Sequence, residues 1–568
     1  MVALILAGCG TNPKTVTIKV VATTDVHGCI FNTDCVDVSE REGSLAKFAT
    51  FLARERKENR NVVYLDAGDV LQGSIEVYQD ATSQFLRSPL VSEAYNYLDC
   101  EAIAMGNHDL SAGSAVYDRF MRALGCPVLS ANLYYVESGD FLLPYRIIER
   151  QGVRIAVLGL TTPVVRYSIP QDQMAEISVG DMVTTAQKWV PVLRDELKAD
   201  VVIGLFHSGL EEGRMDAEGV YEDDSRRVVA TVPGIDAVIY GHDHEANCTS
   251  VVNCEGDTVI MINPGPYALN AAELTVTVDR ENARVDASAR LVDITGEIPD
   301  REFERHLAGW QSDVRSYADS LIGTLNCDLE SNGVLWRSGT AMDYIHTIQM
   351  RFAGAEVSLT APVPTATLIP AGDMRIRDVS KLYRYENTMV SVMLKGSEIK
   401  DILEYSSGLF YNTIGKGTEH LLRLKPDGEG TQPEYPASCF ITAAGLDYTV
   451  DVTKPVGKRV TITQTMRGEK FNPDKYYRTT INSFLYGGTE SYLFDATGLT
   501  RKEMMRRLNS SSSIDIRYYV IADFYINKED HNNVNINRYN NWSLSPAGPV
   551  QGYLKEDTVR FSLIPLNN

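Results

Sequence analysis

The chain lacks any apolar run that approaches the roughly 20 residues a membrane-spanning helix needs, so we expect no spanning segment. Basic residues are also scarce relative to acidic ones: 54 Lys and Arg stand against 75 Asp and Glu, a formal net charge of −21. This negative field, with no basic patch against it, excludes polymeric nucleic acid as a partner. A mononucleotide is compatible with it, because bound metal ions outweigh the average charge locally.

The sequence also has no internal repeat, no low-complexity segment and none of the CxxC spacing that structural zinc sites use. Among its nine cysteines, Cys29/Cys35 and Cys248/Cys254 form two close pairs. They can form disulfides that brace neighbouring loops or remain buried free thiols, and the sequence favours neither. At 568 residues the chain is too long for one hydrophobic core, so we expect two domains.

The amino-terminal residues are apolar and end in Leu-Ala-Gly-Cys9, after which the chain turns polar at once. This segment resembles a bacterial lipoprotein lipobox, although no basic residues precede its apolar stretch. The alternative is a short apolar leader with an incidental cysteine. We expect residues 1–14 to be a lipoprotein leader and tether. The protein would then be exported to the periplasm or the cell surface, with an acyl chain on Cys9 as its only membrane attachment.

Histidine is rare, with nine in the whole chain, and five of these lie in short polar clusters. Each cluster follows an apolar run rich in Val and Ile that reads as a buried strand, such as NVVYLDA before Gly68-Asp69. Loops that leave the carboxyl ends of strands in an open α/β sheet converge on one crevice. The clusters are Asp25-Val-His27, Gly68-Asp69, Gly106-Asn-His-Asp109, His207 and Gly241-His-Asp-His244.

So many imidazoles and carboxylates at strand ends predict a metal site with two metal ions. Neutral imidazole, carboxylate and amide oxygen suit zinc, manganese or iron as divalent ions. Asp69 has two carboxylate oxygens and can bridge a pair. Two cations about 3.5–4 Å apart clamp the attacking and leaving oxygens of an in-line displacement, an arrangement that phosphatases use. A single cluster of this kind would be better explained by polar loop residues or a buried histidine. Five such clusters, each after a predicted strand, are better explained by a metal site.

The series DVHG, GDVLQGS, GNHDL, FHSG and GHDH resembles the motifs of the calcineurin-like metallophosphoesterases. The resemblance implies a layered α/β fold, a β-sandwich flanked by helices, and two divalent cations that activate a hydroxide for attack on phosphorus. By motif position the first cation would be held by Asp25, His27, Asp69 and His244, and the second by Asp69, Asn107, His207 and His242, with Asp69 bridging.

His108 would be the family's non-ligand histidine, which stabilises the charged transition state and protonates the leaving oxygen. Many relatives carry an Asp three residues after this histidine, where this chain has Ser111. Asp109, another acid or no acid at all would then orient His108. We count Asp109 with His108 as the catalytic candidates.

Strand-like and helix-like segments alternate along the first half of the chain, which predicts an α/β domain. Ser44–Glu58 and Asp181–Ala199 are its clearest helices. We expect a metallophosphoesterase domain over residues 15–297, a connecting helix over 298–322, a smaller α/β substrate-binding domain over 323–526, and a tail or edge strands over 527–568.

The second domain carries segments that resemble the C-terminal domain of bacterial 5′-nucleotidases and 2′,3′-cyclic-nucleotide 2′-phosphodiesterases. They are Leu382-Tyr-Arg-Tyr-Glu-Asn387, Leu394-Lys-Gly-Ser-Glu-Ile399 and Ile481-Asn-Ser-Phe-Leu-Tyr-Gly-Gly488. In that family two aromatic rings sandwich the nucleobase, and by motif position these would be Phe440 and Phe484. Such stacking contributes ~1–3 kcal/mol per base and tolerates every base. A single Phe near a strand is more often a core residue.

One departure bears on the substrate. True 5′-nucleotidases show N-x-G-G-x-R after a strand where this chain has Thr360-Ala-Pro-Val-Pro, which resembles the cyclic phosphodiesterase branch instead. We therefore expect a monomeric enzyme that hydrolyses ribonucleoside 2′,3′-cyclic phosphates and then the 3′-nucleotide. The alternatives are a 5′-nucleotidase or UDP-sugar hydrolase on the same site and, from another class, a surface binding lipoprotein with a decayed active site.

Overall fold

The computed structural model describes residues 13–82, 88–169, 174, 176–213, 215, 219–362, 367–425, 433–487, 492–526 and 533–561. The expected lipid attachment at Cys9 lies outside these residues. The chain divides into two compact units, residues 1–166 with 174–314 and residues 167–173 with 315–568. Within the described part, no helix is both long and apolar enough to cross a membrane.

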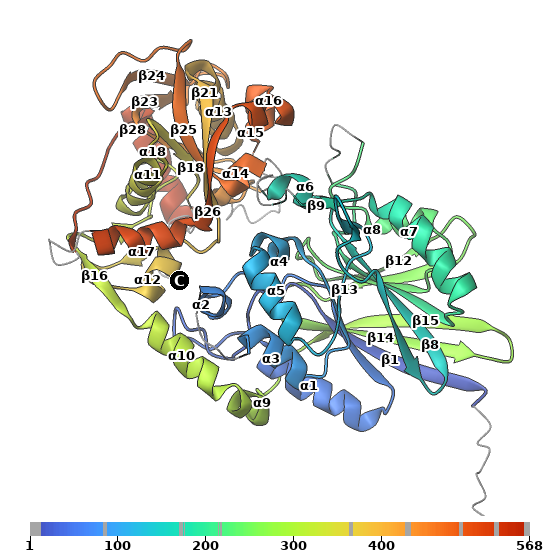
Figure 1. The fold of residues 1–568 in the computed structure, drawn as a ribbon. Coiled ribbons are helices and arrows are strands. Elements are labelled where there is room, and N and C mark those ends of the chain that lie inside the picture. Colours follow the sequence, from blue (N-terminus) through green and yellow to red (C-terminus); the bar gives the residue numbers. More distant parts are fainter. Residues whose placement is uncertain are drawn as a thin grey trace, which may run out of the picture. The chain divides into compact units, whose positions relative to one another are not determined.

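The first unit is built on two six-stranded sheets (Figure 1). The first sheet has the order β15-β14-β1-β2-β3-β4 and the second β12-β13-β11-β10-β8-β7. In the first, β1 (Thr15–Thr23), β2 (Val62–Asp66), β3 (Ala102–Ala104) and β4 (Val128–Leu129) are parallel, with β14 (Asn270–Asp279) and β15 (Arg284–Asp293) at one edge. In the second, β8 (Val153–Thr161), β10 (Val201–His207), β11 (Ala237–Tyr240) and β13 (Thr258–Asn263) are parallel, between β7 (Tyr145–Arg150) and β12 (Asn247–Val252).

The two sheets share one apolar core. Val20, Val63 and Ala102 of the first sheet lie in the same buried cluster as Val157, Ile203 and Ile239 of the second. The five apolar runs ahead of the polar clusters thus form β1, β2, β3, β10 and β11, as predicted. The layered α/β fold with a β-sandwich is confirmed, and the five loops leave the two packed sheets of that sandwich.

Helices cover the outer faces of this sandwich. α1 (Leu45–Glu58) begins at Ser44, whose side chain accepts a hydrogen bond from the Lys47 amide, and its Phe48 ring lies 4.8 Å from Tyr64 of β2. On the other sheet, α7 (Met182–Pro191) and α8 (Ser225–Thr231) bury residues against β8, β10, β11 and β13. The helix expected over Asp181–Ala199 starts as predicted at the Asp181 cap. It continues as a π-helical turn over Val192–Glu196, because Pro191 has no N–H for the α-helical pattern.

Shorter elements complete this part of the chain. They are α2 (Ile75–Thr82), α3 (Leu90–Tyr97), α4 (Asn107–Ser111), α5 (Ser114–Ala123), α6 (Val165–Ser168), α9 (Arg301–His306), α10 (Ala308–Ala318) and the small sheet of β5 (Leu133–Tyr135), β6 (Gly139–Asp140) and β9 (Ile177–Val179). Cys248 and Cys254 are both exposed, and their thiols face different backbone carbonyls, those of Ala289 and Thr231. This pair is therefore neither a disulfide nor a pair of buried thiols.

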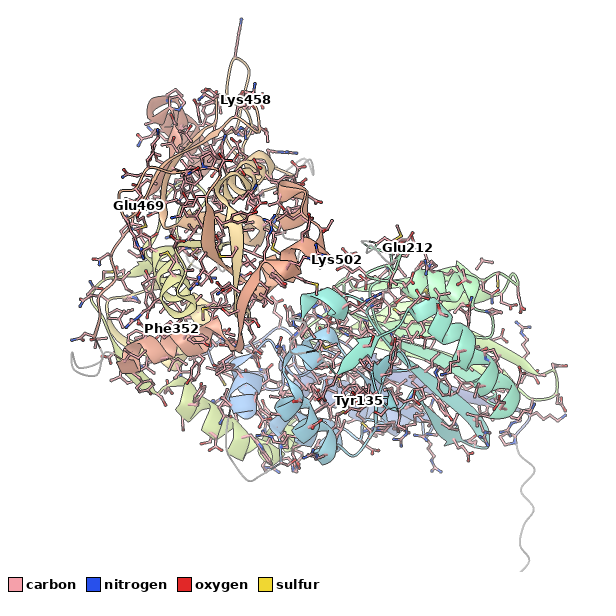
Figure 2. All side chains as sticks on the ribbon, turned by 45° about the horizontal axis from the view of Figure 1, so that its top comes forward. Tyr135, Glu212, Phe352, Lys458, Glu469 and Lys502 are labelled. Atoms are coloured by element: carbon pink, nitrogen blue, oxygen red, sulfur yellow. The ribbon has the colours of Figure 1, made fainter. Side chains whose placement is uncertain are left out.

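The second unit is centred on the sheet β22-β18-β25-β21-β26, formed by β18 (Val357–Thr360), β21 (Thr388–Lys395), β22 (Thr442–Ala444), β25 (Tyr476–Asn482) and β26 (Leu508–Asp515). Its longer helices are α11 (Thr340–Ala353), α13 (Gly396–Phe410) and α17 (Ile516–Ile526). Figure 2 labels Phe352 of α11. Its ring lies 5.0 Å from that of Tyr519 of α17, so an aromatic contact joins the two helices.

Three smaller sheets and several short helices surround this centre. The sheets are β20-β16-β27, from β16 (Leu321–Leu325), β20 (Gly372–Arg375) and β27 (Asn533–Val534); β24-β23-β28, from β23 (Leu446–Asp451), β24 (Val460–Thr465) and β28 (Trp542–Ser545); and β17 (Leu329–Glu330) with β19 (Leu368–Ile369). The helices are α12 (Ile376–Leu382), the 3₁₀ turn Ala437–Cys439, α14 (Ser483–Gly487), α15 (Leu493–Thr497), α16 (Arg501–Arg506) and α18 (Ala547–Phe561).

The end of the chain is part of this fold. It supplies β27 and β28, which are edge strands, and in addition the helix α18. Asp557 of α18 is buried and accepts hydrogen bonds from His420 Nδ1 at 2.9 Å and from the Leu421 amide at 3.0 Å. These bonds hold α18 against the unit.

Phe440 is a core residue of the second unit and is only 4% exposed. Its ring meets Phe410 at 5.1 Å, Tyr411 at 5.8 Å and Trp542 at 6.0 Å between centroids. A ring enclosed by three others has no free face for a nucleobase, which corrects its assignment to base stacking. Phe484 of α14 is half-buried at the edge of the same core.

We expect Phe440→Ala to lower the free energy of unfolding by ~3–5 kcal/mol, the range for removing a packed aromatic ring. Urea unfolding of the purified variant measures this change. Tyr525→Ala is the matched control, since Tyr525 is 48% exposed and its removal should change stability by less than ~0.5 kcal/mol. Equal, small changes in both variants would contradict the buried position of Phe440.

Candidate active site

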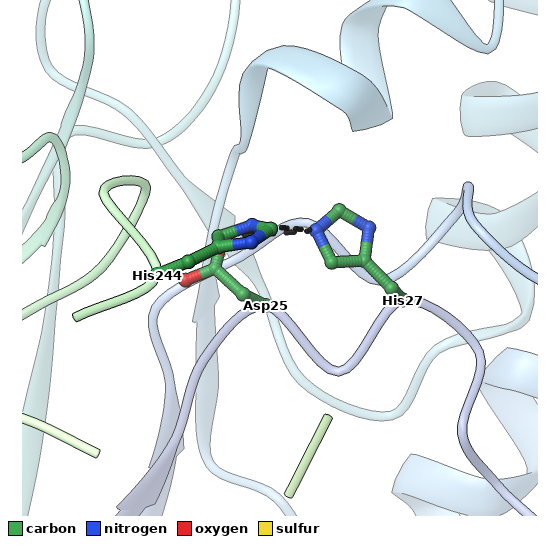
Figure 3. Close-up of side chains that lie close together, drawn as sticks. All are labelled: Asp25, His27 and His244. Carbon is green, nitrogen blue, oxygen red and sulfur yellow. Dashed lines mark hydrogen bonds and ion pairs between the residues drawn. The ribbon is translucent and has the colours of Figure 1, made fainter. Parts of the chain in front are cut away.

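The five polar loops meet at the carboxyl ends of β1, β2, β3, β10 and β11. Asp25, His27 and His244 form one group, and Asp69, His207 and His242 form a second; within each group the candidate ligand atoms lie within 4.8 Å of one another. His27 and His244, which come from opposite sheets, have Nε2 atoms 3.1 Å apart (Figure 3). The structure thus brings together the side chains that the sequence singled out for metal.

Each of the two buried aspartates keeps one carboxylate oxygen unbonded. Asp25 Oδ2 accepts hydrogen bonds from Thr24 Oγ1 at 2.7 Å and the His242 amide at 3.0 Å, whereas Oδ1 accepts none. Asp69 Oδ1 accepts from the His108 amide at 2.8 Å, and Oδ2 accepts none. Asp69 Oδ2 lies 3.2 Å from His207 Nε2 and 3.9 Å from His27 Nε2, so it faces both groups.

The histidines present lone pairs to the same space. His27 Nδ1 donates to the Gln72 carbonyl at 2.9 Å, and His207 Nδ1 donates to the Ala67 carbonyl at 2.8 Å. Because a carbonyl only accepts, Nδ1 carries the proton and Nε2 of the neutral ring is free to ligate. His207 Nε2 in turn lies 3.0 Å from Asn107 Oδ1. Imidazole nitrogens and carboxylate and amide oxygens gathered around one space are the donor atoms that divalent metal ions take, so the residues fit two such ions.

The electrostatics of the site also favours divalent metal ions. Burial opposes ionisation of Asp25, but the neighbouring imidazoles of His244 and His207 lower its pKa below the usual value. Burial likewise opposes ionisation of Asp69, and His207 and His108 lower its pKa. Burial alone would lower the pKa of His207, but the Asp69 carboxylate raises it to about 10. Two buried, ionised carboxylates therefore attract positive charge strongly.

The loop backbone is strained at these residues. Asp25, His27, Asp69, His242 and His244 all adopt the left-handed region, with φ of 48°, 49°, 60°, 82° and 59°. Such conformations cost non-glycine residues ~1–3 kcal/mol each and gather at functional sites. These backbone conformations turn side chains from the two sheets toward one space. The sequence patterns do not predict these conformations.

Two glycines allow the loops to approach one another. A Cβ on Gly106 would lie 2.1 Å from Asp69 Oδ1, and a Cβ on Gly241 would lie 2.0 Å from Thr24 Oγ1. The glycines of GNHD and GHDH are therefore required by close contact with the neighbouring loop.

Asp109 does not contact the His108 imidazole. Its carboxylate accepts four backbone hydrogen bonds, from the amides of Asp69, Val70, Leu71 and Gly106 at 2.8–3.0 Å. This corrects the expectation that Asp109 orients His108: Asp109 fixes the loop after β2 to the loop after β3. Burial and the Asp69 charge raise its pKa to about 6.

Other residues at the site went unnoticed in the sequence. His108 Nδ1 lies 2.8 Å from Gln72 Oε1, within the GDVLQGS motif. Tyr267 has a φ of 60° and a ring 5.9 Å from both His27 and His244; its signal was the Pro-Gly-Pro-Tyr turn. Glu222 and Asp223 form a further group with His242.

Comparison with known proteins agrees with this geometry. Residues 18–246 match the family model described as calcineurin-like phosphoesterase, and residues 321–497 match that of the 5′-nucleotidase C-terminal domain. The fold and these matches define a hydrolytic phosphoesterase that uses divalent metal ions. The chain belongs to the family in which a calcineurin-like phosphoesterase domain is followed by a 5′-nucleotidase C-terminal domain.

Similar proteins come from several bacteria. The chain is 25% identical, over 93% of its length, to the trifunctional nucleotide phosphoesterase protein YfkN of Bacillus subtilis, but covers only 39% of that protein. It is 24% identical to a Haemophilus influenzae 2′,3′-cyclic-nucleotide 2′-phosphodiesterase/3′-nucleotidase, covering 97% of this chain and 90% of the relative. The crystal structure of a putative 5′-nucleotidase from Staphylococcus aureus has the same fold, with a TM-score of 0.75 and 19% identity over 93% of this chain and 100% of that one.

We expect Asp69→Asn to fold but to lose bound metal and activity together, because a neutral amide offers only one good ligand atom where two cations need a shared, charged carboxylate. Elemental analysis and turnover on the purified variant measure both. Asp373→Asn is the control, since Asp373 is an exposed surface residue of β20. Normal metal content with normal turnover would remove Asp69 from the site.

Proposed function

We propose that this enzyme hydrolyses ribonucleoside 2′,3′-cyclic phosphates to the nucleoside 3′-phosphate and then releases phosphate. The observation that carries the proposal is the Asp69 Oδ2 atom, buried and unbonded between two groups of metal-binding side chains. The names of relatives support the substrate, since one relative each from Haemophilus influenzae, Yersinia enterocolitica and Salmonella typhimurium is named 2′,3′-cyclic-nucleotide 2′-phosphodiesterase/3′-nucleotidase. The Thr360-Ala-Pro sequence, in place of the 5′-nucleotidase motif, supports it as well.

In this proposal Asp25, His27 and His244 hold one cation, Asn107, His207 and His242 hold the other, and Asp69 joins them. Zinc, manganese or iron suits this nitrogen and oxygen donor set. When bound, the two ions supply positive charge for the phosphoryl oxygens and acidify a water molecule. The carbonyls of Gln72 and Ala67 keep two of the imidazoles in the ligating tautomer.

His108 lies beside these ligands without belonging to either group. Its backbone amide donates to Asp69 Oδ1, and its ring meets His27 edge-on at 5.5 Å between centroids. From there the Nε2–H of the protonated imidazole would act on the phosphoryl oxygens and give its proton to the leaving ribose oxygen, which leaves the neutral ring with its proton on Nδ1. Phosphoryl transfer depends mainly on such positioning and neutralisation of charge.

A panel assay tests the substrate. We expect the highest kcat/KM with adenosine 2′,3′-cyclic phosphate, lower values with 3′-AMP, and little activity with 5′-AMP or UDP-glucose. A chelator should abolish all of them, and added Zn²⁺ or Mn²⁺ should restore them. Preference for 5′-AMP would support the 5′-nucleotidase named among other relatives. Binding without turnover by metal-loaded protein would support a surface binding lipoprotein.

We expect His108→Ala to retain both metal ions but to lower kcat by ~10²–10⁴-fold, the usual contribution of a proton-transfer group. The contrast with the Asp69 variant separates chemistry from metal binding. Metal loss as complete as in Asp69→Asn would reassign His108 as a ligand.

We expect Phe484→Ala to weaken hydrolysis of nucleotides while sparing bis(p-nitrophenyl) phosphate, because only a substrate with a base gains from stacking. The ratio of kcat/KM for the two substrates is the measurement. Equal losses on both would remove Phe484 from base recognition and leave it a packing residue.

The location of the enzyme is part of the proposal. The Leu-Ala-Gly-Cys9 segment supports export and acylation at Cys9, with the enzyme a monomer held at the periplasmic face or the cell surface. Mass spectrometry of the amino-terminal peptide from the native host tests this. An unmodified peptide that begins at Met1 would contradict the anchor.

A further inference from the structure

Among the residues that the structure describes, no carboxylate accepts a hydrogen bond from the ring of His108, the histidine expected to act on the leaving group. The position three residues after it is Ser111, whose hydroxyl donates to the His108 carbonyl at 3.1 Å and not to the ring. The neighbouring Asp109 is engaged by four backbone amides. The ring is nevertheless held, because His108 Nδ1 lies 2.8 Å from Gln72 Oε1.

Gln72 contacts two imidazoles of the site with two different groups. Its side-chain oxygen meets His108, and its main-chain carbonyl accepts from His27 Nδ1 at 2.9 Å. The residue is only 7% exposed, so water competes little for either contact. An amide oxygen only accepts, so His108 carries its Nδ1 proton toward Gln72 and directs Nε2 away from it.

The loop that carries Gln72 is itself fixed. Asp109 Oδ1 accepts the amides of Val70 at 2.8 Å and Leu71 at 2.9 Å, immediately before Gln72. Gly73 follows with a φ of 118°, and a Cβ there would lie 2.7 Å from His27 Cβ. Asp109 thus acts on His108 only indirectly, because it fixes the backbone of the loop that carries Gln72.

We propose that Gln72 is the positioning residue of His108 and takes the place of a carboxylate partner. The amide fixes the ring plane and the tautomer, so that Nε2 faces the reacting phosphoryl group. The Nδ1–H is present in both the neutral and the charged ring, so the contact does not depend on the charge of His108. An amide also adds no negative charge next to an anionic substrate. This inference rests on the proposed role of His108 but not on the identity of the nucleotide.

A double-mutant cycle tests the proposal. Gln72→Leu removes the acceptor and keeps the side-chain volume, and it is made in the native protein and in His108→Ala. Turnover is measured with bis(p-nitrophenyl) phosphate as well as adenosine 2′,3′-cyclic phosphate, so that the cycle can be read even if the nucleotide is not the substrate. Gln79→Leu is the matched control, since Gln79 is another buried glutamine on the neighbouring helix α2.

We expect Gln72→Leu to lower kcat by about 10–100-fold, the range for groups that orient functional histidines, with KM, metal content and melting temperature unchanged. In the His108→Ala background the same substitution should have no further effect. Gln72→Glu should restore kcat, because a carboxylate also accepts from Nδ1–H, but raise KM, because its charge repels the substrate. Gln79→Leu should match the native enzyme in all of these.

Several results would overturn the proposal. A loss of the same size in the His108→Ala background would show that Gln72 acts independently of the ring. Loss of metal would show that its role lies in holding His27. Native kcat in Gln72→Leu would show that the contact does nothing. If Gln72→Leu does not fold, nitrogen NMR of the ring in zinc-loaded Gln72→Glu decides the point, since a proton on Nε2 instead of Nδ1 of neutral His108 contradicts the assigned tautomer.

Discussion

The structure depends on one electrostatic constraint. The carboxylates of Asp25 and Asp69 are buried among histidine rings, and their charge must be neutralised. Asp25 and Asp69 are both essentially inaccessible to solvent, and each leaves one oxygen without a hydrogen-bond partner. Buried unpaired charge is among the most costly features a protein can contain unless a metal or a counter-charge compensates it. The architecture of the first unit meets this constraint. The carboxyl ends of strands in both sheets lie at one site, and glycines allow the loops there to come into contact.

Much of the site could be predicted from the sequence because its ligands follow strands that are apolar without interruption. β2, β3, β10 and β11 are buried at every residue and β1 over its last four, so the polar residue after each of these strands lies at the end of a buried strand. The helix caps at Ser44 and Asp181 could be predicted for an equally local reason, since a short polar side chain ahead of an apolar period satisfies free amides.

The remaining features depend on three-dimensional contacts that no local pattern records. Asp109 follows His108 directly, but adjacent side chains on the short helix α4 do not share a face, so adjacency in sequence did not mean contact. Gln72 lies 36 positions before His108 in the sequence and has a neutral side chain. It is therefore not identified when only acidic residues are considered as partners of the histidine. Phe440 reads as a ligand-facing aromatic by motif position, but three rings from distant segments enclose it.

We infer that two divalent cations occupy the two groups that meet at Asp69. Anomalous X-ray diffraction from crystals of metal-loaded enzyme, measured on both sides of the zinc, iron and manganese absorption edges, tests it directly and also identifies the ions. We expect two peaks, one among Asp25, His27 and His244, the other among Asn107, His207 and His242, with Asp69 touching both. A single peak, or a second peak at Glu222 and Asp223 away from Asp69, would contradict it.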